Sequence, residues 1–511
     1  MSHNFSRNKK ITILTAIFLF ALLLRLWNLY DVGRTYDEEA YVKPGYQFIE
    51  LIKKGDFGNT LWWEAPDEPP FARYLYGITA QFDVIKNNHI QEPTFNYDFR
   101  FSRLVSVLFS SLAVVLITAI GLRYVSVFVG ICAGIIFAML PFSLGFSQLA
   151  TLESLIMFFF TANIFLFLSL LEKYSMKKVL TLGILFGLAA SVKVTNILVF
   201  PLFLLMYAVW FFCKGKKKHI EILNKQTYAL LYIGILGIIT FFVIWPMPWF
   251  HLDHVARYLH QLRFSTHLSI PEVFFGKLHL APVYYYAVLF LITTPAIVLL
   301  LFSVGLIEVK KTKKWIFYLF VLWFFFPFIQ SFYHMRQQGV RYIIEIYAPL
   351  SLIAAIGFDS TISAITKNTL KKLVCLIPLI IYLFILLARI TPYYTNYFNE
   401  LIGGAGGVYR TKLFQLGWWG EGTKEAVVFL ENIAPPYAII GIVERQLRLA
   451  PPTKTLKIVP YTDNRTFDYV ILHYYNILRE GFDDKGIKKK YVLIHCVKAD
   501  GACLIAIYKK K

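Results

Sequence analysis

The distribution of hydrophobic residues along this chain predicts a protein that crosses a membrane many times. Apolar residues occur in blocks of roughly 18 to 22, the length of helix that spans a hydrocarbon core about 30 Å thick. The first block is too long for a cleaved signal peptide, and no small-residue cleavage site follows it. We therefore predict about eleven retained spans, over residues 11–30, 102–122, 125–145, 153–171, 179–192, 195–212, 227–245, 284–307, 315–332, 342–358 and 372–390.

The charge of the connecting segments predicts how the chain is oriented. Alternate loops are short and basic, and the positive-inside rule assigns such loops to the cytoplasm. With an odd number of spans, the N-terminus is then cytoplasmic and the C-terminus extracytoplasmic, in a multi-pass protein of the cell membrane. The basic loops comprise residues 9–10, 173–178, 214–218, 310–314 and 367–372.

The longer segments fall on the opposite side of the membrane. The first outside loop, residues 31–101, is rich in Asp, Glu, Trp and Tyr, and the second, residues 246–283, contains several histidines and aromatics. The tail lacks a further span, and its pattern predicts one helix followed by short strands. We therefore expect an all-α transmembrane domain over residues 1–395 and a small extracytoplasmic α/β domain over residues 396–511. The tail elements are a helix at 421–432 and strands at 438–443, 469–473, 491–497 and 503–508.

The composition agrees with this organisation and limits the possible functions. Among the 511 residues, 16% are charged and the mean hydropathy is +0.56, whereas soluble proteins have about a quarter of their residues charged. The net charge of +21 would suggest a nucleic-acid partner, but most of it lies in short loops, where it determines topology. Of the five cysteines, only Cys496 and Cys503 are placed to form a disulfide in an outside domain.

An acidic cluster, Tyr36-Asp37-Glu38-Glu39, follows the first span and is the first candidate for chemistry. A carboxylate near the outer membrane edge suits general-base catalysis, because partial burial raises its pKa toward the range where it can accept a proton. The alternative is a solvated acidic start of the loop, with no catalytic role.

Three further charged residues are expected at the outer ends of spans: Glu153, Lys193 and Arg341. An ionised side chain at membrane depth costs roughly 2.5–3.5 kcal/mol, so it is usually retained for a function. Glu153 would then share a site with Asp37, and the two cations would bind a phosphate. The alternatives are that Glu153 complements a helix dipole and that the cations extend to lipid headgroups.

The second outside loop raises the question of a metal. Four of its histidines, at positions 251, 254, 260 and 267, lie close together but match no zinc spacing of the HExxH kind. An interfacial amphipathic segment over residues 249–264 explains them better. A divalent cation remains possible, but the sequence assigns it no ligands. No Walker motif, no Ser-His-Asp pattern and no CxxC motif is present, so nothing indicates an ATP-driven pump.

Several of these features occur together in one known family. The order of one span, the Tyr-Asp-Glu motif, and a loop containing Glu68-Pro69-Pro70-Phe71-Ala72-Arg73 resembles the GT-C glycosyltransferases. The nearest groups are the protein O-mannosyltransferases and aminoarabinose transferases of family 39. The resemblance spans residues 11 to about 425 and continues through segments 100–104, 151–154, 187–193, 341–344, 397–404 and 417–422.

The resemblance implies a GT-C fold and an inverting transfer of a sugar from a polyprenyl-phosphate donor. The acceptor would be a protein, a lipid or a cell-surface glycan outside the cytoplasmic membrane. Asp37 matches the catalytic base, Glu38 and Glu153 match accessory acids, and Arg73 matches a basic residue near the donor phosphate. Two departures concern the motif's first residue, Glu68, where relatives often have His or Lys, and Glu153, where relatives commonly have Asp.

Two other functions are compatible with the sequence. A transporter or lipid flippase would also carry charges within its spans, but we see no clear internal repeat, and the charges gather toward one face. A ligase or polymerase of cell-surface polysaccharide would use the same kind of donor, and the sequence separates it poorly from the leading hypothesis.

Overall fold

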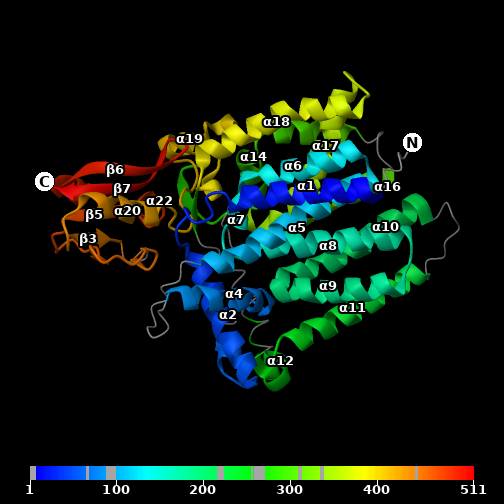
Figure 1. Ribbon diagram of the computed structural model, residues 1–511, viewed down its shortest axis with the longest axis horizontal. Coiled ribbons are helices and arrows are strands. Elements are labelled where there is room, and N and C mark those ends of the chain that lie inside the picture. Colours follow the sequence, from blue (N-terminus) through cyan, green and yellow to red (C-terminus); the bar gives the residue numbers. More distant parts are fainter. Residues whose placement is uncertain are drawn as a thin grey trace.

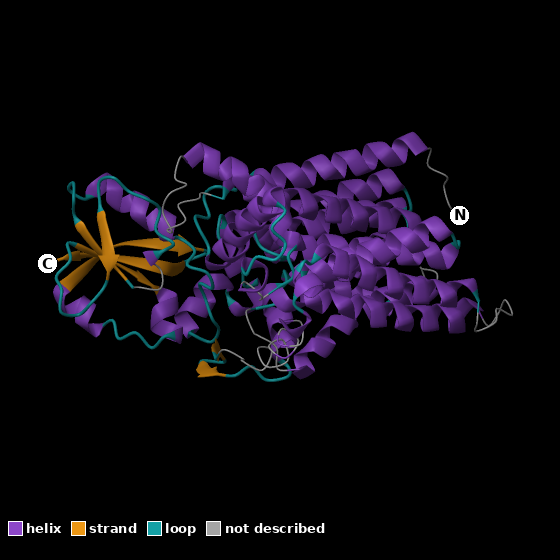
Figure 2. Cartoon of the chain, turned by 90° about the horizontal axis from the view of Figure 1, so that it is seen from below, coloured by secondary structure: helices purple, strands orange, loops and turns teal. Residues whose placement is uncertain are grey.

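The protein consists of a long bundle of helices with a small sheet domain at one end. The computed structural model describes residues 7–64, 68–87, 99–215, 224–254, 257, 260, 271–308, 314–333, 339–443 and 447–511. The two ends of the chain lie at opposite ends of the molecule, the N-terminus beside the bundle and the C-terminus in the sheet domain (Figures 1 and 2). This arrangement agrees with the predicted division into a helical part and a tail with strands.

Six helical segments in the described part of the chain are long and apolar enough to cross a membrane. Two bent pairs of helices raise this number to as many as eight, if each pair is one span. The six are α5 (Arg100–Tyr124), α8 (Glu153–Glu172), Val194–Lys214 with α10 (Val199–Trp210), α11 (Lys225–Ile244), Gly339–Ser363 with α17 (Tyr347–Ser363), and α18 (Thr369–Ile390). The pairs are α6 (Val127–Met139) with α7 (Pro141–Ser147) and α14 (Tyr285–Thr293) with α15 (Ala296–Ile307).

Three other predicted spans form helices that are short or that carry charges. They are α1 (Arg7–Leu26), α9 (Met176–Val192) and α16 (Lys314–Phe325). They pack among the long helices, α1 against α5 and α9 against α8 and α11. The number of about eleven spans therefore stays a prediction, while the multi-span helical architecture is confirmed.

Large apolar side chains cover the outer surfaces of the bundle. On α11 and α18 the exposed residues include Leu231, Ile238, Val374, Ile381 and Phe384. In water such a surface would be costly, whereas in a bilayer it contacts lipid tails. The outward faces of these two helices therefore belong in the membrane.

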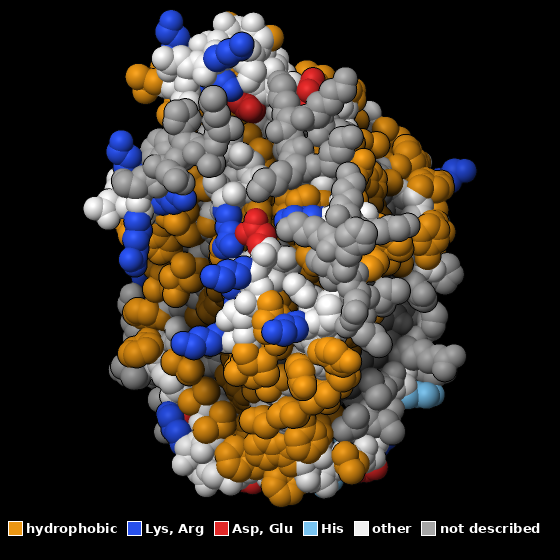
Figure 3. Space-filling model, turned by 90° about the vertical axis from the view of Figure 1, so that its right-hand side faces the viewer, with side chains coloured by type: hydrophobic (Ala, Val, Ile, Leu, Met, Phe, Trp, Pro, Cys, Tyr) orange, Lys and Arg blue, Asp and Glu red, His pale blue; other side chains and the backbone are white. Residues whose placement is uncertain are grey.

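Basic residues gather at the end of the bundle away from the sheet domain (Figure 3). Lys372 pairs with Asp359 at 2.5 Å, and the Lys214 amine lies 5.0 Å from the centre of the Trp315 ring. The described basic residues of these loops thus lie at one end of the bundle, the arrangement that the positive-inside rule predicts.

The predicted first outside loop is mostly helical. It contains α2 (Tyr36–Lys54), α3 (Leu61–Glu64) and α4 (Phe71–Asn87), and α2 packs along α4 at the end of the bundle nearest the sheet domain (Figure 1). The two backbones meet at Gly45 and Gly77, where an added Cβ on either residue would collide with the other helix. The hydrophobic pattern did not predict these helices, because they have polar faces and because α2 contains Pro44.

The tail forms a five-stranded mixed sheet in the order β4-β3-β5-β7-β6. Strand β3 pairs in parallel with β4 and β5, whereas β7 is antiparallel to both β5 and β6. Cys496 and Cys503 form a disulfide across the β6–β7 hairpin, with their Cα atoms 5.5 Å apart. The elements are β3 (Ile439–Ile442), β4 (Lys457–Pro460), β5 (Tyr469–His473), β6 (Tyr491–Ala499), β7 (Ala502–Lys510), α20 (Thr423–Ile433), α22 (Tyr474–Arg479) and α23 (Lys485–Lys490).

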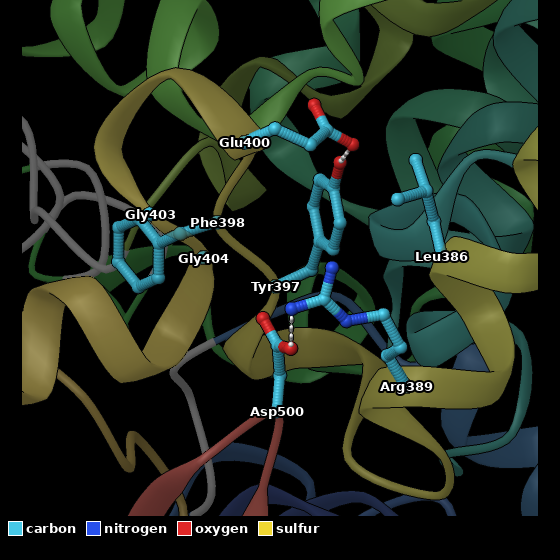
Figure 4. Close-up of a pocket in the computed structure, with 8 residues that line it drawn as sticks. All are labelled: Leu386, Arg389, Tyr397, Phe398, Glu400, Gly403, Gly404 and Asp500. Atoms are coloured by element: carbon cyan, nitrogen blue, oxygen red, sulfur yellow. Dashed lines mark hydrogen bonds and ion pairs between the residues drawn. The ribbon is translucent and has the colours of Figure 1, made fainter.

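The hairpin tip attaches the sheet domain to the end of α18. Arg389 pairs with Asp500 at 2.7 Å, and the Asp500 amide donates to the Arg389 carbonyl at 3.1 Å. A pocket opens beside this pair, lined also by Tyr397 and Glu400 (Figure 4). Gly404, at the start of α19 (Gly404–Thr411), has a φ of +67° and faces Asp500 so closely that a Cβ would collide with the carboxylate.

Candidate functional site

A buried arginine joins two of the predicted acids at the junction of the bundle and the sheet domain. The Arg341 Nη1 donates to Asp37 Oδ2, and its Nε donates to Glu153 Oε1. The Arg341 side chain is 5% exposed, Glu153 is fully buried, and Asp37 keeps 29% exposure. The three residues come from far apart in the sequence, and Asp37 is the member that an outside molecule can reach.

Local structure explains where each of these three side chains points. Asp37 is the second residue of α2, whose capping box at Thr35 begins the helix. Glu153 is the first residue of α8, after a turn whose Thr151 carbonyl accepts a hydrogen bond from the Tyr76 hydroxyl. Arg341 begins the short helix η6 (Arg341–Ile346), which leads into α17. All three therefore lie at helix beginnings, where a side chain can leave the apolar bundle.

Lys193 belongs to the same cluster. It is 5% exposed and occupies the break between α9 and η1 (Val194–Leu198). Its amine lies 4.2 Å from the centre of the Tyr342 ring, and its charge interacts with Glu68, Glu153, Glu345 and Arg341. Two buried cations and several carboxylates thus share this region, an arrangement that compensates their burial.

Arg73 lies at the edge of the cluster. It is 3% exposed, its Nη1 donates to the Glu68 carbonyl at 3.0 Å, and its guanidinium is 6.0 Å from the centre of the Tyr41 ring. The structure thus brings Arg73 and Glu68 toward the site, and Glu68 contributes its backbone carbonyl to this contact.

Tyr41 is a site residue that the sequence analysis missed. It lies one turn after Asp37 on the same face of α2, and its hydroxyl interacts electrostatically with Asp37, Glu153 and Arg341. Burial raises its pKa well above the ordinary value, so the hydroxyl keeps its proton and can donate a hydrogen bond. The four-residue spacing from Asp37 was the available signal.

Glu38 does not join this cluster, although it is adjacent to Asp37 in sequence. Its carboxylate is fully buried and pairs with Arg103, at 2.7 Å from Nε and 2.8 Å from Nη2. It also accepts from the Ala150 amide at 3.0 Å and from the amide and hydroxyl of Thr35. Arg103 in turn donates to the carbonyls of Leu29 and Gly33. The pair fastens the start of α2 to α5 and to the turn before Glu153.

A second buried acid supports the segment before Arg341. Glu272, in β1 (Glu272–Phe274) of a hairpin with β2 (Lys277–His279), accepts from the Tyr285 hydroxyl. That hydroxyl accepts from the Gly339 amide at 3.0 Å. Burial raises the pKa of the Glu272 carboxyl to about 8, although the Tyr285 hydrogen bond and Arg479 lower it. The Glu272 side chain therefore helps to fix the turn that presents Arg341.

Metal-ligand geometry occurs at one place in the described ranges, away from Asp37. His251, Asp253 and His254 follow α12 (Met247–Phe250), and their ligand atoms lie within 4.8 Å of one another. Asp253 also pairs with Arg257 at 2.6 Å, so it already has a cationic partner. Much of the predicted interfacial segment 249–264 and all of its neighbour His267 lie outside the described residues.

The cluster has the properties needed to transfer a group from a phosphate. A partly exposed carboxylate can accept a proton, while buried cations that are already oriented can stabilise a phosphate leaving group without reorganising. Apolar side chains cover the outer surfaces of the bundle.

Known structures share this architecture. The chain is similar to ArnT from Cupriavidus metallidurans bound to undecaprenyl phosphate, with a TM-score of 0.51 and 12% identity over 98% of each chain. It is also similar to the apo form of the Archaeoglobus fulgidus oligosaccharyltransferase, with a TM-score of 0.50 and 13% identity over 96% of this chain and 73% of that one. At these identities the likeness concerns the fold. No curated protein sequence matches the chain significantly.

The bundle of membrane helices with a charged site beside a small sheet domain is thus a fold that this chain shares with known structures. Residues 15–270, about half of the chain, match the model of the dolichyl-phosphate-mannose-protein mannosyltransferases. The chain belongs to this family. It is therefore a membrane glycosyltransferase of the GT-C class that takes its sugar from a lipid-phosphate donor, which confirms the resemblance seen in the sequence.

Proposed function

We propose that the protein transfers a sugar, with inversion, from a polyprenyl-phosphate donor to an acceptor on the outer face of the cytoplasmic membrane, with Asp37 as the general base. The observation that carries this proposal is the pairing of Asp37 with a buried arginine. Asp37 is the exposed partner of Arg341, at 29%, whereas Glu153 is fully buried. A base must meet its proton donor directly, and Asp37 alone of the two acids can do so.

The bond changes are those of a single displacement. The acceptor hydroxyl oxygen attacks the anomeric carbon while Asp37 takes the hydroxyl proton, and the bond from that carbon to the phosphate oxygen breaks. Attack opposite to the leaving group inverts the configuration. The lipid phosphate leaves with the bonding electron pair, and no ATP is consumed because the donor is already activated.

Arg341, Lys193 and Arg73 would stabilise the charge that develops on the leaving phosphate. A phosphate that binds Arg341 competes with Asp37 for the same guanidinium, so donor binding would release the carboxylate for its role as base. Glu153 would keep hold of the Arg341 Nε throughout, which preserves the orientation of the guanidinium. Glu153 thus affects the reaction by orienting Arg341, and Glu38 affects it by stabilising the fold.

The distribution of charge supports a position of the site on the outer face of the membrane. The basic loops lie at the far end of the bundle, and the site lies beside the sheet domain (Figures 1 and 3). If the basic end is cytoplasmic, the site and residues 396–511 are outside. Protease added to intact cells should then remove the sheet domain, and protection of this domain until the cells are permeabilised would reverse the orientation.

The nature of the acceptor is the remaining choice. A protein, a lipid or a surface glycan would each present a nucleophile to Asp37 in the same way. We favour no single acceptor, and a polysaccharide ligase remains the second candidate because it shares the donor and the site.

The test is the Asp37→Asn variant, which preserves shape and removes the base. Activity is followed as release of polyprenyl phosphate from a panel of polyprenyl-phosphate sugars in reconstituted membranes. A general base contributes about 10²- to 10⁴-fold, so we expect a loss in that range. Glu39→Gln, which changes another carboxylate of the same helical turn, is the matched control and should stay active. An active Asp37→Asn enzyme would refute the assignment.

A further inference from the structure

A tight turn of the C-terminal domain reaches the site. Residues 417–420 have the sequence Gly-Trp-Trp-Gly, and both glycines have a positive φ, +71° at Gly417 and +78° at Gly420. The Gly417 amide donates to Asn396 Oδ1 at 2.7 Å, and the Trp419 amide donates to Glu421 Oε2 at 3.0 Å. Since glycine adopts this backbone without strain, the sequence fixes the direction of the turn.

The turn places the Trp419 indole over Arg341. The guanidinium carbon lies 5.4 Å from the centre of the indole ring, within the range of a cation–π interaction. Phe146 packs edge-on against the same indole at 5.4 Å. Trp419 is only 4% exposed. Trp419, a residue of the tail, thus contacts one face of the Arg341 guanidinium. Asp37 and Glu153 accept hydrogen bonds at the edge of the same group.

The indole N–H of Trp419 is the unusual feature of this arrangement. It is buried and has no hydrogen-bond acceptor among the described residues. A buried donor left without an acceptor is destabilising, and phenylalanine would provide an aromatic face at this position without that cost. The N–H lies in the same residue that contacts Arg341, so an anion bound by Arg341 is a suitable acceptor.

Other contacts show that the tail surrounds the start of α2. The Arg448 guanidinium stacks 3.8 Å from the centre of the Tyr36 ring, next to Asp37. Lys424, at the start of α20, packs its Cβ against Gly33 and donates to the Tyr30 carbonyl. The tail therefore contacts the segment that leads into α2, as well as Arg341 within the site.

We propose that the C-terminal domain completes the donor site through Trp419. The indole face positions the Arg341 guanidinium, and the indole N–H donates a hydrogen bond to a phosphate oxygen of the lipid carrier. This inference rests on the proposed function, because it takes Arg341 as a phosphate ligand. It adds a hydrogen-bond donor from the tail, a part of the chain that has no role in the mechanism proposed above.

The test uses undecaprenyl phosphate as the probe and measures its binding to the full-length protein in detergent. Trp419→Phe keeps an aromatic face and removes the N–H, so we expect the affinity to fall about tenfold, the effect of one hydrogen bond to a charged group. Trp419→Leu removes the face as well and should bind more weakly still. The matched controls are Trp323→Phe and Trp323→Leu, at a fully buried tryptophan of α16 whose N–H also lacks an acceptor among the described residues.

The outcomes separate the two proposals. Normal binding by Trp419→Phe would refute the N–H contact, and so would an equal loss of binding in Trp323→Phe, which would indicate a general effect on packing. The melting temperature of each variant is compared within its matched pair. If the unaltered protein fails to bind undecaprenyl phosphate, or if Asp37→Asn keeps its activity, the proposed function itself fails. If Asp37→Asn is inactive while both Trp419 variants bind normally, only the inference from Trp419 fails.

Discussion

The Glu38→Gln substitution should destabilise the fold, although the residue lies next to the proposed base. Glutamine matches the shape of glutamate but leaves Arg103 without a carboxylate in a site where both side chains are almost fully buried. Removing one partner of a buried ion pair costs about 3–5 kcal/mol. Glu38 also closes the capping box at Thr35, and the loss of a helix cap costs about 1 kcal/mol. Glutamine keeps some of these hydrogen bonds, so we expect a total of about 3–5 kcal/mol.

The assay is thermal unfolding of the detergent-solubilised protein together with activity per folded molecule. For a large chain the expected loss corresponds to a fall in melting temperature of about 5–10 °C. Asp37→Asn should leave the melting temperature nearly unchanged, because its carboxylate is partly exposed and Arg341 keeps its contact with Glu153. Arg103→Lys should resemble Glu38→Gln, since lysine cannot make the forked contacts of the guanidinium.

The structural role of Glu38 is refuted if Glu38→Gln melts like the unaltered protein and yet loses activity as completely as Asp37→Asn. That result would place Glu38 in the chemistry, as its match to an accessory acid of the family implies. A variant that is less stable but keeps most of its activity at low temperature would support the structural role.

Two further predictions concern stability. Because burial raises the pKa of Glu272 from 4.5 to about 8, the folded state holds a proton that the unfolded chain releases between these values. The resulting stability is complete below about pH 4.5 and is lost as the pH rises through about 8, by at most about 5 kcal/mol. Glu272→Gln should flatten the fall in melting temperature between about pH 5 and 8, and an unchanged slope would contradict this. Gly77→Ala should force α4 away from α2, which would lower the free energy of unfolding by about 1–3 kcal/mol and reduce activity. The control is Gly58→Ala, whose added Cβ meets no atom within 4 Å and should change neither stability nor activity. Equal melting temperatures for the two variants would disprove the close packing.

Much of the architecture followed from the sequence because membrane spans are determined by local composition. A block of apolar residues must form a helix in a bilayer, where each backbone group needs an internal partner. The strands of the tail were likewise predictable from short β-branched runs, and β5 begins and ends at the predicted residues, Tyr469–His473. Strand β4, Lys457–Pro460, was missed because its four residues carry little alternation.

The predicted first outside loop shows where the pattern fails. Helices α2 and α4 lie in a segment that is not apolar enough to indicate membrane helices, and their packing depends on two glycines, Gly45 and Gly77, that are 32 positions apart. No local signal reports such a contact. For Tyr41 the four-residue spacing from Asp37 was a local signal, but only the tertiary structure brings this face of α2 to Glu153 and Arg341.

The sequence by itself determined that this chain spans a membrane, and it predicted Glu153, Lys193 and Arg341 at the outer ends of spans and Asp37 as the candidate base. Only the tertiary structure decided which charges meet. Asp37 and Glu38 are neighbours in the chain, but consecutive side chains of a helix point about 100° apart, so the first pairs with Arg341 and the second with Arg103. The physical reason is that a buried charge is stable only beside an opposite charge or hydrogen-bond partners, and those partners come from segments up to 304 residues away.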